Sequence, residues 1–306
     1  MRKAITVIAV VLVLVLIGAG AYSWLSSSDR SPIPESQRDD LPGLEEITEP
    51  DWCPDVEVVS TGGTWESWPT DDPFNPTFNP NSFMLSITGP LQAAYDINDV
   101  RVWTTPYTAQ FKNINSQGEM SYDESRAEGT ARVTGELEHI HQTCPSTDFI
   151  LMGFSQGAVI TGDIADRIGG GQGVIPAEKV RGVVLVADGR REPGVGVNPG
   201  VEVDGIGAEI SLQPVSGLIQ FVVPGATMTG ERPNEFGALA DRTYQICAPE
   251  DSVCDAPYDI GNGIDRAMGL VEATGIHAQY ASNPDVIPGT TTTQWAIDWA
   301  HGLINQ

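Results

Sequence analysis

Short apolar runs recur along the chain from Trp52 to its end. They are rich in valine, isoleucine and aromatic residues, and they read VEVVS (56–60), VRVWT (100–104), FILMG (149–153), VRGVVLVA (180–187) and YQIC (244–247). Several of them lack a strict alternation of apolar and polar positions, which is typical of strands covered on both faces. We therefore predict five buried strands.

Helical patterns fall between these runs. Ser121 and Glu124 form a capping-box sequence ahead of a stretch with apolar residues on one face. A second pattern stops at the glycines 169–171, and a third carries Trp295 and Trp299 near the end of the chain. This alternation predicts an α/β fold, a three-layer sandwich around a mostly parallel, about five-stranded central sheet. In such sheets the functional groups gather at the carboxyl ends of the strands.

The N-terminal residues predict export. Arg2 and Lys3 precede an uncharged run over residues 4–25. A helix of that length, at about 1.5 Å per residue, crosses a hydrocarbon core about 30 Å thick, and the basic residues keep residues 1–3 in the cytoplasm. The alternative is a cleaved signal peptide, because the sequence AGA at 19–21 resembles a cleavage site. We favour a transmembrane signal-anchor because the apolar run exceeds the usual signal-peptide core of about 7–15 residues.

Residues 26–51 have the composition of an extended linker. They contain eight acidic residues, two arginines and four prolines, and are too polar and too proline-broken to pack. The remainder, residues 52–306, is long enough for one large α/β domain. Within it, residues 190–240 are rich in glycine and apolar residues. We interpret them as a lid-like insertion over the site, with an extra hairpin at the sheet edge as the alternative.

The formal net charge of −25, from 41 acidic and 16 basic residues, narrows the possible partners. Nucleic acid is excluded because phosphate binding needs a basic surface, and attraction to anionic lipid through charge is disfavoured. The hydrophobic content of 41% is normal for a globular core. We expect a soluble, monomeric acidic domain outside the cell.

Four cysteines in an exported chain predict two disulfides, for which three pairings are possible. Cys247 and Cys254 are seven positions apart and easily joined, which leaves Cys53 to pair with Cys144. A zinc site is disfavoured because the chain has no Cys-x-x-Cys pair. We expect neither a metal nor a cofactor.

The sequence GFSQG, at 153–157, stands where the third predicted strand ends and a helix begins. In that setting G-x-S-x-G predicts a sharp turn that exposes a serine nucleophile, here Ser155. The glycines are needed because the chain passes close to itself, and the helix N-terminus favours negative charge near the serine. The alternative is an ordinary turn between a strand and a helix.

A serine nucleophile needs a base, and the chain has four histidines. In this fold class the order is serine, then acid, then histidine, which excludes His139 and His141. His277 follows a predicted helix in a short segment, where a loop can place it over the serine. His301 lies within the final helical pattern and is more simply a cation at a helix end. We predict that His277 is the base.

Two carboxylates compete for the role of orienting the histidine. Asp251 lies just past the fifth predicted strand, in a loop that the expected short disulfide holds in place. Asp188 also ends a strand, and its alternative role is an ion pair with Arg190 or Arg191. We favour Asp251, with Asp188 as the serious rival.

An oxyanion hole needs two backbone donors. The residue after the nucleophile, Gln156, supplies one, and a loop after an early strand supplies the other. The first predicted strand leads into such a loop, in which Gly62 and Gly63 let the backbone turn and Thr64 follows. An ordinary glycine turn is the alternative for this loop.

Together these motifs resemble the cutinases over residues 52–306. The resemblance rests on GFSQG, on C-x-x-x-D-x-x-C at 247–254, on H-x-x-Y at 277–280 and on a cysteine eleven residues before the serine. Longer phrases such as GTWESWPTDDPFNP, VWTTPYTAQF, SYDESRAEG and ADGRREPGVG are similar to the membrane-anchored cutinase-like lipid esterases of mycolic-acid-bearing actinobacteria.

The resemblance implies an α/β-hydrolase-like fold and a triad of Ser155, Asp251 and His277. It also implies an oxyanion hole lined by Thr64 and Gln156, and the same two disulfides, Cys53–Cys144 and Cys247–Cys254. The activities it implies are those of a carboxylesterase, thioesterase and phospholipase A on cell-envelope lipids, linked to mycolic-acid metabolism. One departure is that secreted cutinases carry Ala-Arg-Gly before the oxyanion Ser or Thr, where this chain has TGG at 61–63. That difference argues against cutin as the substrate.

Two other functions fit the same residues. An acyltransferase uses the same triad with a sugar or lipid hydroxyl as the acceptor in place of water. An envelope-binding protein would keep the fold of an esterase without its catalysis. The complete triad favours an enzyme, and we expect a lipid or acyl ester as its substrate.

Overall fold

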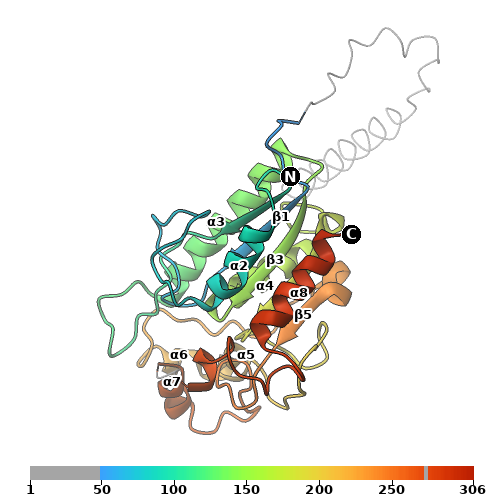
Figure 1. Cartoon of the computed structure of the whole chain (residues 1–306). Coiled ribbons are helices and arrows are strands. Elements are labelled where there is room, and N and C mark those ends of the chain that lie inside the picture. The colour runs from blue at the N-terminus through green and yellow to red at the C-terminus, as the bar shows by residue number, and fades with distance from the viewer. Residues whose placement is uncertain (1–48, 272–274) are drawn as a thin grey trace, which may run out of the picture. The chain divides into compact units, whose positions relative to one another are not determined.

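Five parallel strands form one sheet, which is the central layer of the folded domain (Figure 1). The computed structural model describes residues 49–271 and 275–306. The strands are β1 (Val56–Thr61), β2 (Val100–Thr104), β3 (Asp148–Phe154), β4 (Val180–Val186) and β5 (Thr243–Ile246), in the spatial order β2-β1-β3-β4-β5. Every neighbouring pair is parallel. The prediction of a five-stranded parallel sheet is confirmed, strand by strand.

Helices cover both faces of the sheet and complete a three-layer sandwich. The longer ones are α2 (Phe83–Ala94), α3 (Tyr122–Thr143), α4 (Gln156–Gly169), α7 (Gly263–Val271) and α8 (Thr292–Ile304). The short ones are η2 (Ala177–Lys179), α5 (Ala208–Ser211), η3 (Gln213–Val215), α6 (Ser216–Ile219), η4 (Gly237–Arg242) and η5 (Gly275–Ala278). Helices α2 and α8 pack on one face of the sheet, and α3 and α4 pack on the other.

The strands lack alternation because both of their faces are buried. On β3, Ile150 and Met152 pack into the cluster under α2 and α8, while Phe149 and Leu151 pack into the cluster under α3 and α4. All four side chains are fully buried. Burial of a side chain of this size contributes about 1.5–3 kcal/mol, so the central strand stabilises the sheet through both layers.

The expected capping box begins α3. The Ser121 hydroxyl accepts from the N–H of Glu124, and the Glu124 carboxylate accepts from the N–H of Ser121. Helix α2 was not predicted, because Pro90 interrupts its sequence where proline normally ends a helix. Its N-terminus is capped by Ser82, whose hydroxyl accepts from the N–H of Leu85.

Both expected disulfides are present. Cys53 is joined to Cys144, which ties the segment before β1 to the end of α3, and Cys247 is joined to Cys254 across the loop after β5. The described part of the chain therefore contains no free cysteine.

The predicted anchor at 4–25 and most of the predicted linker at 26–51 lie outside the described residues. Over residues 49–271 and 275–306, no helix has the length and apolar character needed to cross a bilayer. The segment 190–240 contains α5, η3, α6 and the start of η4, and its residue Val197 forms an isolated parallel bridge with Tyr244 of β5 at the sheet edge.

The turn after β3 generates a prediction about stability. A Cβ at Gly157 would lie 2.1 Å from the carbonyl oxygen of Thr61 and 2.4 Å from that of Gly62, and neither backbone atom can move without disturbing β1. We expect Gly157→Ala to lower the free energy of unfolding by at least about 1–3 kcal/mol, the usual cost of overpacking a core. Urea unfolding followed by circular dichroism measures this.

Gly135→Ala is the matched control. Gly135 is an exposed residue inside α3, and a Cβ there meets nothing within 4 Å. The same substitution should then stabilise the protein by up to about 1 kcal/mol through helix propensity. Equal stability of Gly157→Ala and the wild type would contradict the packing described for this turn.

Candidate active site

Ser155 occupies a strained backbone conformation between β3 and α4. Its φ is 53° and its ψ is −120°, a region that non-glycine residues rarely adopt. The turn is tight enough that a Cβ at Gly153 would lie 2.4 Å from the carbonyl oxygen of Gly157. The two glycines of GFSQG are thus required by contact of the chain with itself, as the sequence predicted.

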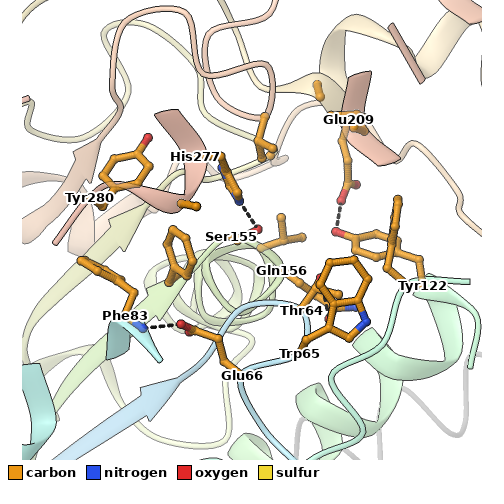
Figure 2. Close-up of a pocket in the computed structure, with 18 of the residues that line it drawn as sticks. Thr64, Trp65, Glu66, Phe83, Tyr122, Ser155, Gln156, Glu209, His277 and Tyr280 are labelled. Atoms are coloured by element: carbon orange, nitrogen blue, oxygen red, sulfur yellow. Dashed lines mark hydrogen bonds between the residues drawn. The ribbon is translucent and has the colours of Figure 1, made fainter. Parts of the chain in front are cut away.

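The conformation turns the Ser155 hydroxyl away from the helix that it precedes. A serine at an N-cap normally accepts from the first N–H groups of the helix, but Ser155 makes no such side-chain bond to α4. Its hydroxyl lies 2.9 Å from Nε2 of His277 instead (Figure 2). The strained turn therefore presents the hydroxyl to a histidine 122 positions later in the chain.

His277 connects the serine to Asp251. The imidazole lies in η5, and its Nδ1 is 3.0 Å from Oδ1 and 2.9 Å from Oδ2 of Asp251. The ring of Phe154 stacks on it, with the ring centroids 5.2 Å apart. The imidazole is thus held from one edge by the carboxylate and on one face by the residue next to the serine. The structure brings Ser155, His277 and Asp251 together in the order expected from the sequence.

Asp251 is buried in the loop between the two cysteines of the short disulfide. Burial alone would raise the pKa of its carboxyl, but hydrogen bonds from His277, from Tyr280 and from the N–H of Val253 outweigh it and lower the pKa. The carboxylate therefore stays ionised beside the imidazole, where it favours the tautomer with the proton on Nδ1.

Tyr280 was not assigned a role from the sequence. Its buried hydroxyl donates to Oδ2 of Asp251 at 2.7 Å and accepts from the N–H of Ala248 at 2.9 Å. It thus fixes the carboxylate to the backbone after β5. The sequence contained one indication of this contact, because H-x-x-Y places the tyrosine three positions after His277. The two rings are close in space.

The loop after β1 lies against the nucleophile. A Cβ at Gly63 would be 3.1 Å from Cβ of Ser155, so the backbone of this loop is in contact with the serine. The Thr64 hydroxyl is 3.5 Å from Oε1 of Gln156. Beneath the loop, the buried hydroxyl of Tyr107 donates to the carbonyl oxygen of Gly62 at 2.7 Å. Thr64 and Gln156 consequently flank Ser155, where the sequence placed the oxyanion hole.

The rival histidine, His301, and the rival acid, Asp188, lie in other surroundings. Nδ1 of His301 is 2.6 Å from the hydroxyl of Tyr95, next to α2. Asp188 forms an ion pair with Arg232 and accepts from the N–H of Arg190. The alternative role proposed for Asp188, an ion pair, is therefore found, but the partner expected from the sequence was wrong. Arg232 was missed because it is 44 positions away in sequence.

A cavity of about 320 Å³ opens over the serine. Its lining is mainly apolar and includes Ser155 and His277, together with segments of the 190–240 region and of α7 (Figure 2). Ala208, Met228 and Leu270 are the apolar contributions of those segments. The space next to the serine can thus take an apolar group.

Charged side chains attach the 190–240 region to the rest of the domain. Glu209, in the cavity wall, accepts from the Tyr122 hydroxyl at 2.6 Å and pairs with Arg126 of α3 at 3.1 Å. Asp163 of α4 pairs with Arg126, Arg190 and Arg232. Burial would raise the pKa of Asp163, but the three guanidinium groups outweigh it and lower the pKa. The cavity wall is therefore held by ion pairs as well as by apolar packing.

The described residues contain no group of three or more His, Cys, Asp or Glu side chains placed to hold a metal ion. The arrangement can carry out proton transfer from Ser155 through His277 without one.

The family profile described as Cutinase matches residues 75–280. A curated relative from Corynebacterium glutamicum, named Carboxylesterase Culp6 homolog, is 60% identical over 308 residues, covering 100% of this chain and 99% of the relative. This organism is a mycolic-acid-bearing actinobacterium, in agreement with the resemblance of the longer sequence phrases to the cutinase-like lipid esterases of such bacteria.

Solved structures with similar folds include two esterase-like proteins from fungi. The catalytic core domain of acetyl xylan esterase from Trichoderma reesei is 18% identical, with a TM-score of 0.48, over 83% of this chain and 98% of that one. A cutinase-like protein from Cryptococcus sp. is 20% identical, with a TM-score of 0.48, over 83% of this chain and 96% of that one.

The resemblance found in the motifs is confirmed by the profile, which covers more than half of the chain and includes Ser155, Asp251 and His277. On this match and on the full-length relative at 60% identity, the chain belongs to the cutinase family.

Proposed function

We propose that this protein is a serine carboxylesterase that hydrolyses ester or thioester bonds of lipids outside the cytoplasm. The observation that carries the proposal is the hydrogen-bonded series Ser155–His277–Asp251 at the edge of a mainly apolar cavity. The name of the Corynebacterium glutamicum relative, a carboxylesterase, supports the same reaction.

The reaction proceeds through an acyl-enzyme. His277 takes the proton of Ser155 through Nε2 while the serine oxygen attacks the substrate carbonyl, and Asp251 stabilises the imidazolium that forms. The N–H groups of Gln156 and Thr64 donate to the oxyanion. The imidazolium then protonates the leaving group, and water, deprotonated by His277, releases the acid from the serine.

The substrate class follows from the cavity and the resemblance. An acyl chain fits the apolar wall that Ala208 and Met228 of the 190–240 region and Leu270 of α7 provide, so the 190–240 region acts as part of a cover that accepts this chain. We place the enzyme in the metabolism of cell-envelope mycolate lipids, with thioesterase and phospholipase A activities as expected variants of the same chemistry. The N-terminal run at 4–25 and the two disulfides support an anchored enzyme outside the cell.

The nucleophile can be identified by labelling. After incubation with a fluorophosphonate probe, mass spectrometry should find the phosphonyl group on the peptide that contains Ser155, because only an activated serine reacts quickly. Ser155→Ala should not be labelled. Well-folded wild-type protein with an unmodified Ser155 would contradict the hydrolase and favour an envelope-binding protein.

The acceptor can be identified from the products. With p-nitrophenyl butyrate as the acyl donor and glucose as a competing acceptor, we expect free butyrate to be the main product, because the cavity opens to solvent beside the serine. Chromatography of the products measures the ratio. An excess of acylated glucose over free acid would show an acyltransferase.

Replacement of Asp251 should lower kcat, whereas replacement of Asp188 should lower the stability of the fold. Asp251→Asn should lower kcat by about 10³–10⁴-fold in folded protein, because the imidazole would adopt the wrong tautomer. Asp188→Asn should leave kcat per folded molecule close to that of the wild type, but it should lower the free energy of unfolding by about 1–3 kcal/mol, since Arg232 would lose one of its two carboxylate partners and keep Asp163. Kinetics and urea unfolding of both variants measure this. The opposite result, an inactive Asp188→Asn and an active Asp251→Asn, would reverse the assignment.

A further inference from the structure

Glu66 is a carboxylate in the wall of the cavity that the proposed reaction does not use. It follows the loop after β1, two positions beyond Thr64. Its Oε2 accepts from the N–H of Gly63 at 2.9 Å, and its Oε1 accepts from the N–H of Phe83 (Figure 2). One side chain thus joins the loop beside the nucleophile to the first residue of α2.

Both ends of this bridge are sites where the backbone needs an acceptor. The first N–H groups of a helix have no partner within the helix, and the cap residue Ser82 serves the N–H of Leu85. The carboxylate of Glu66 serves the N–H of Phe83, at the positive end of the helix dipole. On the loop side, the N–H of Glu66 also donates to the carbonyl oxygen of Gly63 at 3.0 Å, so the two residues bind each other twice.

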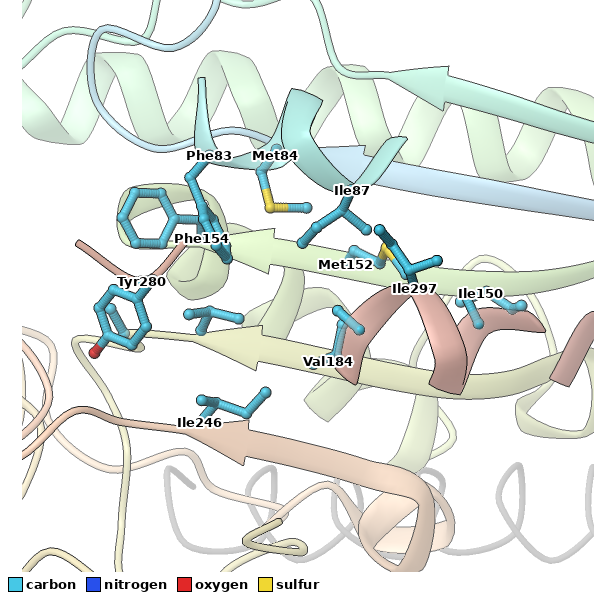
Figure 3. Packing of buried hydrophobic residues seen from close by; sticks show 14 of the residues in the cluster. Phe83, Met84, Ile87, Ile150, Met152, Phe154, Val184, Ile246, Tyr280 and Ile297 are labelled. Atoms are coloured by element: carbon cyan, nitrogen blue, oxygen red, sulfur yellow. The ribbon is translucent and has the colours of Figure 1, made fainter. Parts of the chain in front are cut away.

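The loop has little freedom to shift without affecting the serine. Cβ positions built on Gly62 and Gly63 would lie 2.9 Å from Cβ of Glu66 and 3.1 Å from Cβ of Ser155, respectively. At the other end of the bridge, the ring of Phe83 packs against those of Phe154 and Tyr280, with centroids 4.8 and 6.1 Å apart (Figure 3). The bridge therefore connects the loop to side chains that hold the nucleophile and the triad acid.

The carboxyl group of Glu66 is desolvated in the folded protein. Burial raises the pKa of Glu66, against the lowering effect of hydrogen bonds from Gly63 and Phe83. A pKa raised by folding means that the folded protein favours the protonated form of the group. The contribution of Glu66 protonation to the free energy of unfolding is therefore largest at low pH, and it is lost as the pH rises through the raised pKa.

We infer that Glu66 is a positioning residue, which holds the oxyanion loop at the distance from Ser155 that the transition state requires. Both of its carboxylate oxygens accept from backbone N–H groups, so it acts through the loop and not on the reacting atoms. Through the N–H of Gly63 it determines where the next residue, Thr64, presents its own N–H. This inference rests on the proposed function, because an oxyanion hole matters only if Ser155 is the nucleophile.

Glu66→Gln tests the inference. The amide has the same shape but only one acceptor oxygen, so its NH₂ group faces one of the two backbone donors. Because the oxyanion forms only in the transition state, we expect kcat and kcat/KM for p-nitrophenyl butyrate to fall together by about 10–100-fold, with KM within about twofold of wild type. The melting temperature at pH 7 should stay within about 4 °C of wild type.

Glu66→Asp is the second variant. It keeps the charge but is one methylene shorter, so it cannot reach both donors, and kcat should fall as in Glu66→Gln. The control is Glu57→Gln, the same change at a buried carboxylate at the opposite end of β1, where Glu57 pairs with Arg101 at 3.3 Å. This control should leave kcat and KM unchanged.

The outcomes distinguish a failure of the positioning role of Glu66 from a failure of the proposed function. If Ser155→Ala is inactive and either Glu66 variant folds with wild-type kcat, or with a raised KM alone, the positioning role is overturned while the proposed function stands. If Ser155→Ala retains activity, the proposed function fails, and the role of Glu66 fails with it. If Glu66→Gln does not fold, Glu66→Asp carries the test with the same expected loss.

Discussion

The site depends on the parallel pairing of β1 with β3. In this register Thr61 lies opposite Gly153, so both strands end at the same level at the edge of the sheet. The segment that leaves β1 becomes the loop with Thr64, and the segment that leaves β3 becomes the turn with Ser155. Their contact is so close that only glycine fits at 157, against the carbonyl oxygen of Thr61. The proposed nucleophile and the proposed oxyanion loop are neighbours because two parallel strands end together.

The other two members of the proposed triad, Asp251 and His277, come from segments after β5. Asp251 follows β5, the edge strand, and the short disulfide closes its loop. His277 comes from η5, and its orientation is determined by Asp251, by the ring of Phe154 and by Ser155 itself. Tyr280 links this side to the backbone at Ala248. The site is therefore assembled from the segments that follow β1, β3 and β5 at the carboxyl ends of one parallel sheet, together with His277 from η5.

Much of this was predictable because it depends on local sequence. The five strands are continuous apolar runs, and the turn with Ser155 needs glycines that the sequence displays. The contacts of Arg232, Tyr280 and Glu66 could not be predicted in the same way. Each joins residues that are distant in sequence, such as Asp188 with Arg232 or Glu66 with Phe83, and the partner is determined only when the sheet forms. Helix α2 was missed because its proline contradicts local propensity, while burial of Met84, Ile87 and Leu91 stabilises it.

The central claim is that Ser155, the His277–Asp251 pair and the N–H groups of Thr64 and Gln156 act on one carbonyl group. A crystal structure of the protein after reaction with a p-nitrophenyl phosphonate tests it most directly, because the phosphonyl group imitates the tetrahedral intermediate. We expect a bond from Oγ of Ser155 to phosphorus, with the phosphonyl oxygen within about 2.7–3.1 Å of the N–H groups of Thr64 and Gln156. Phosphorus bound to another side chain, or a phosphonyl oxygen directed away from both N–H groups, would contradict it.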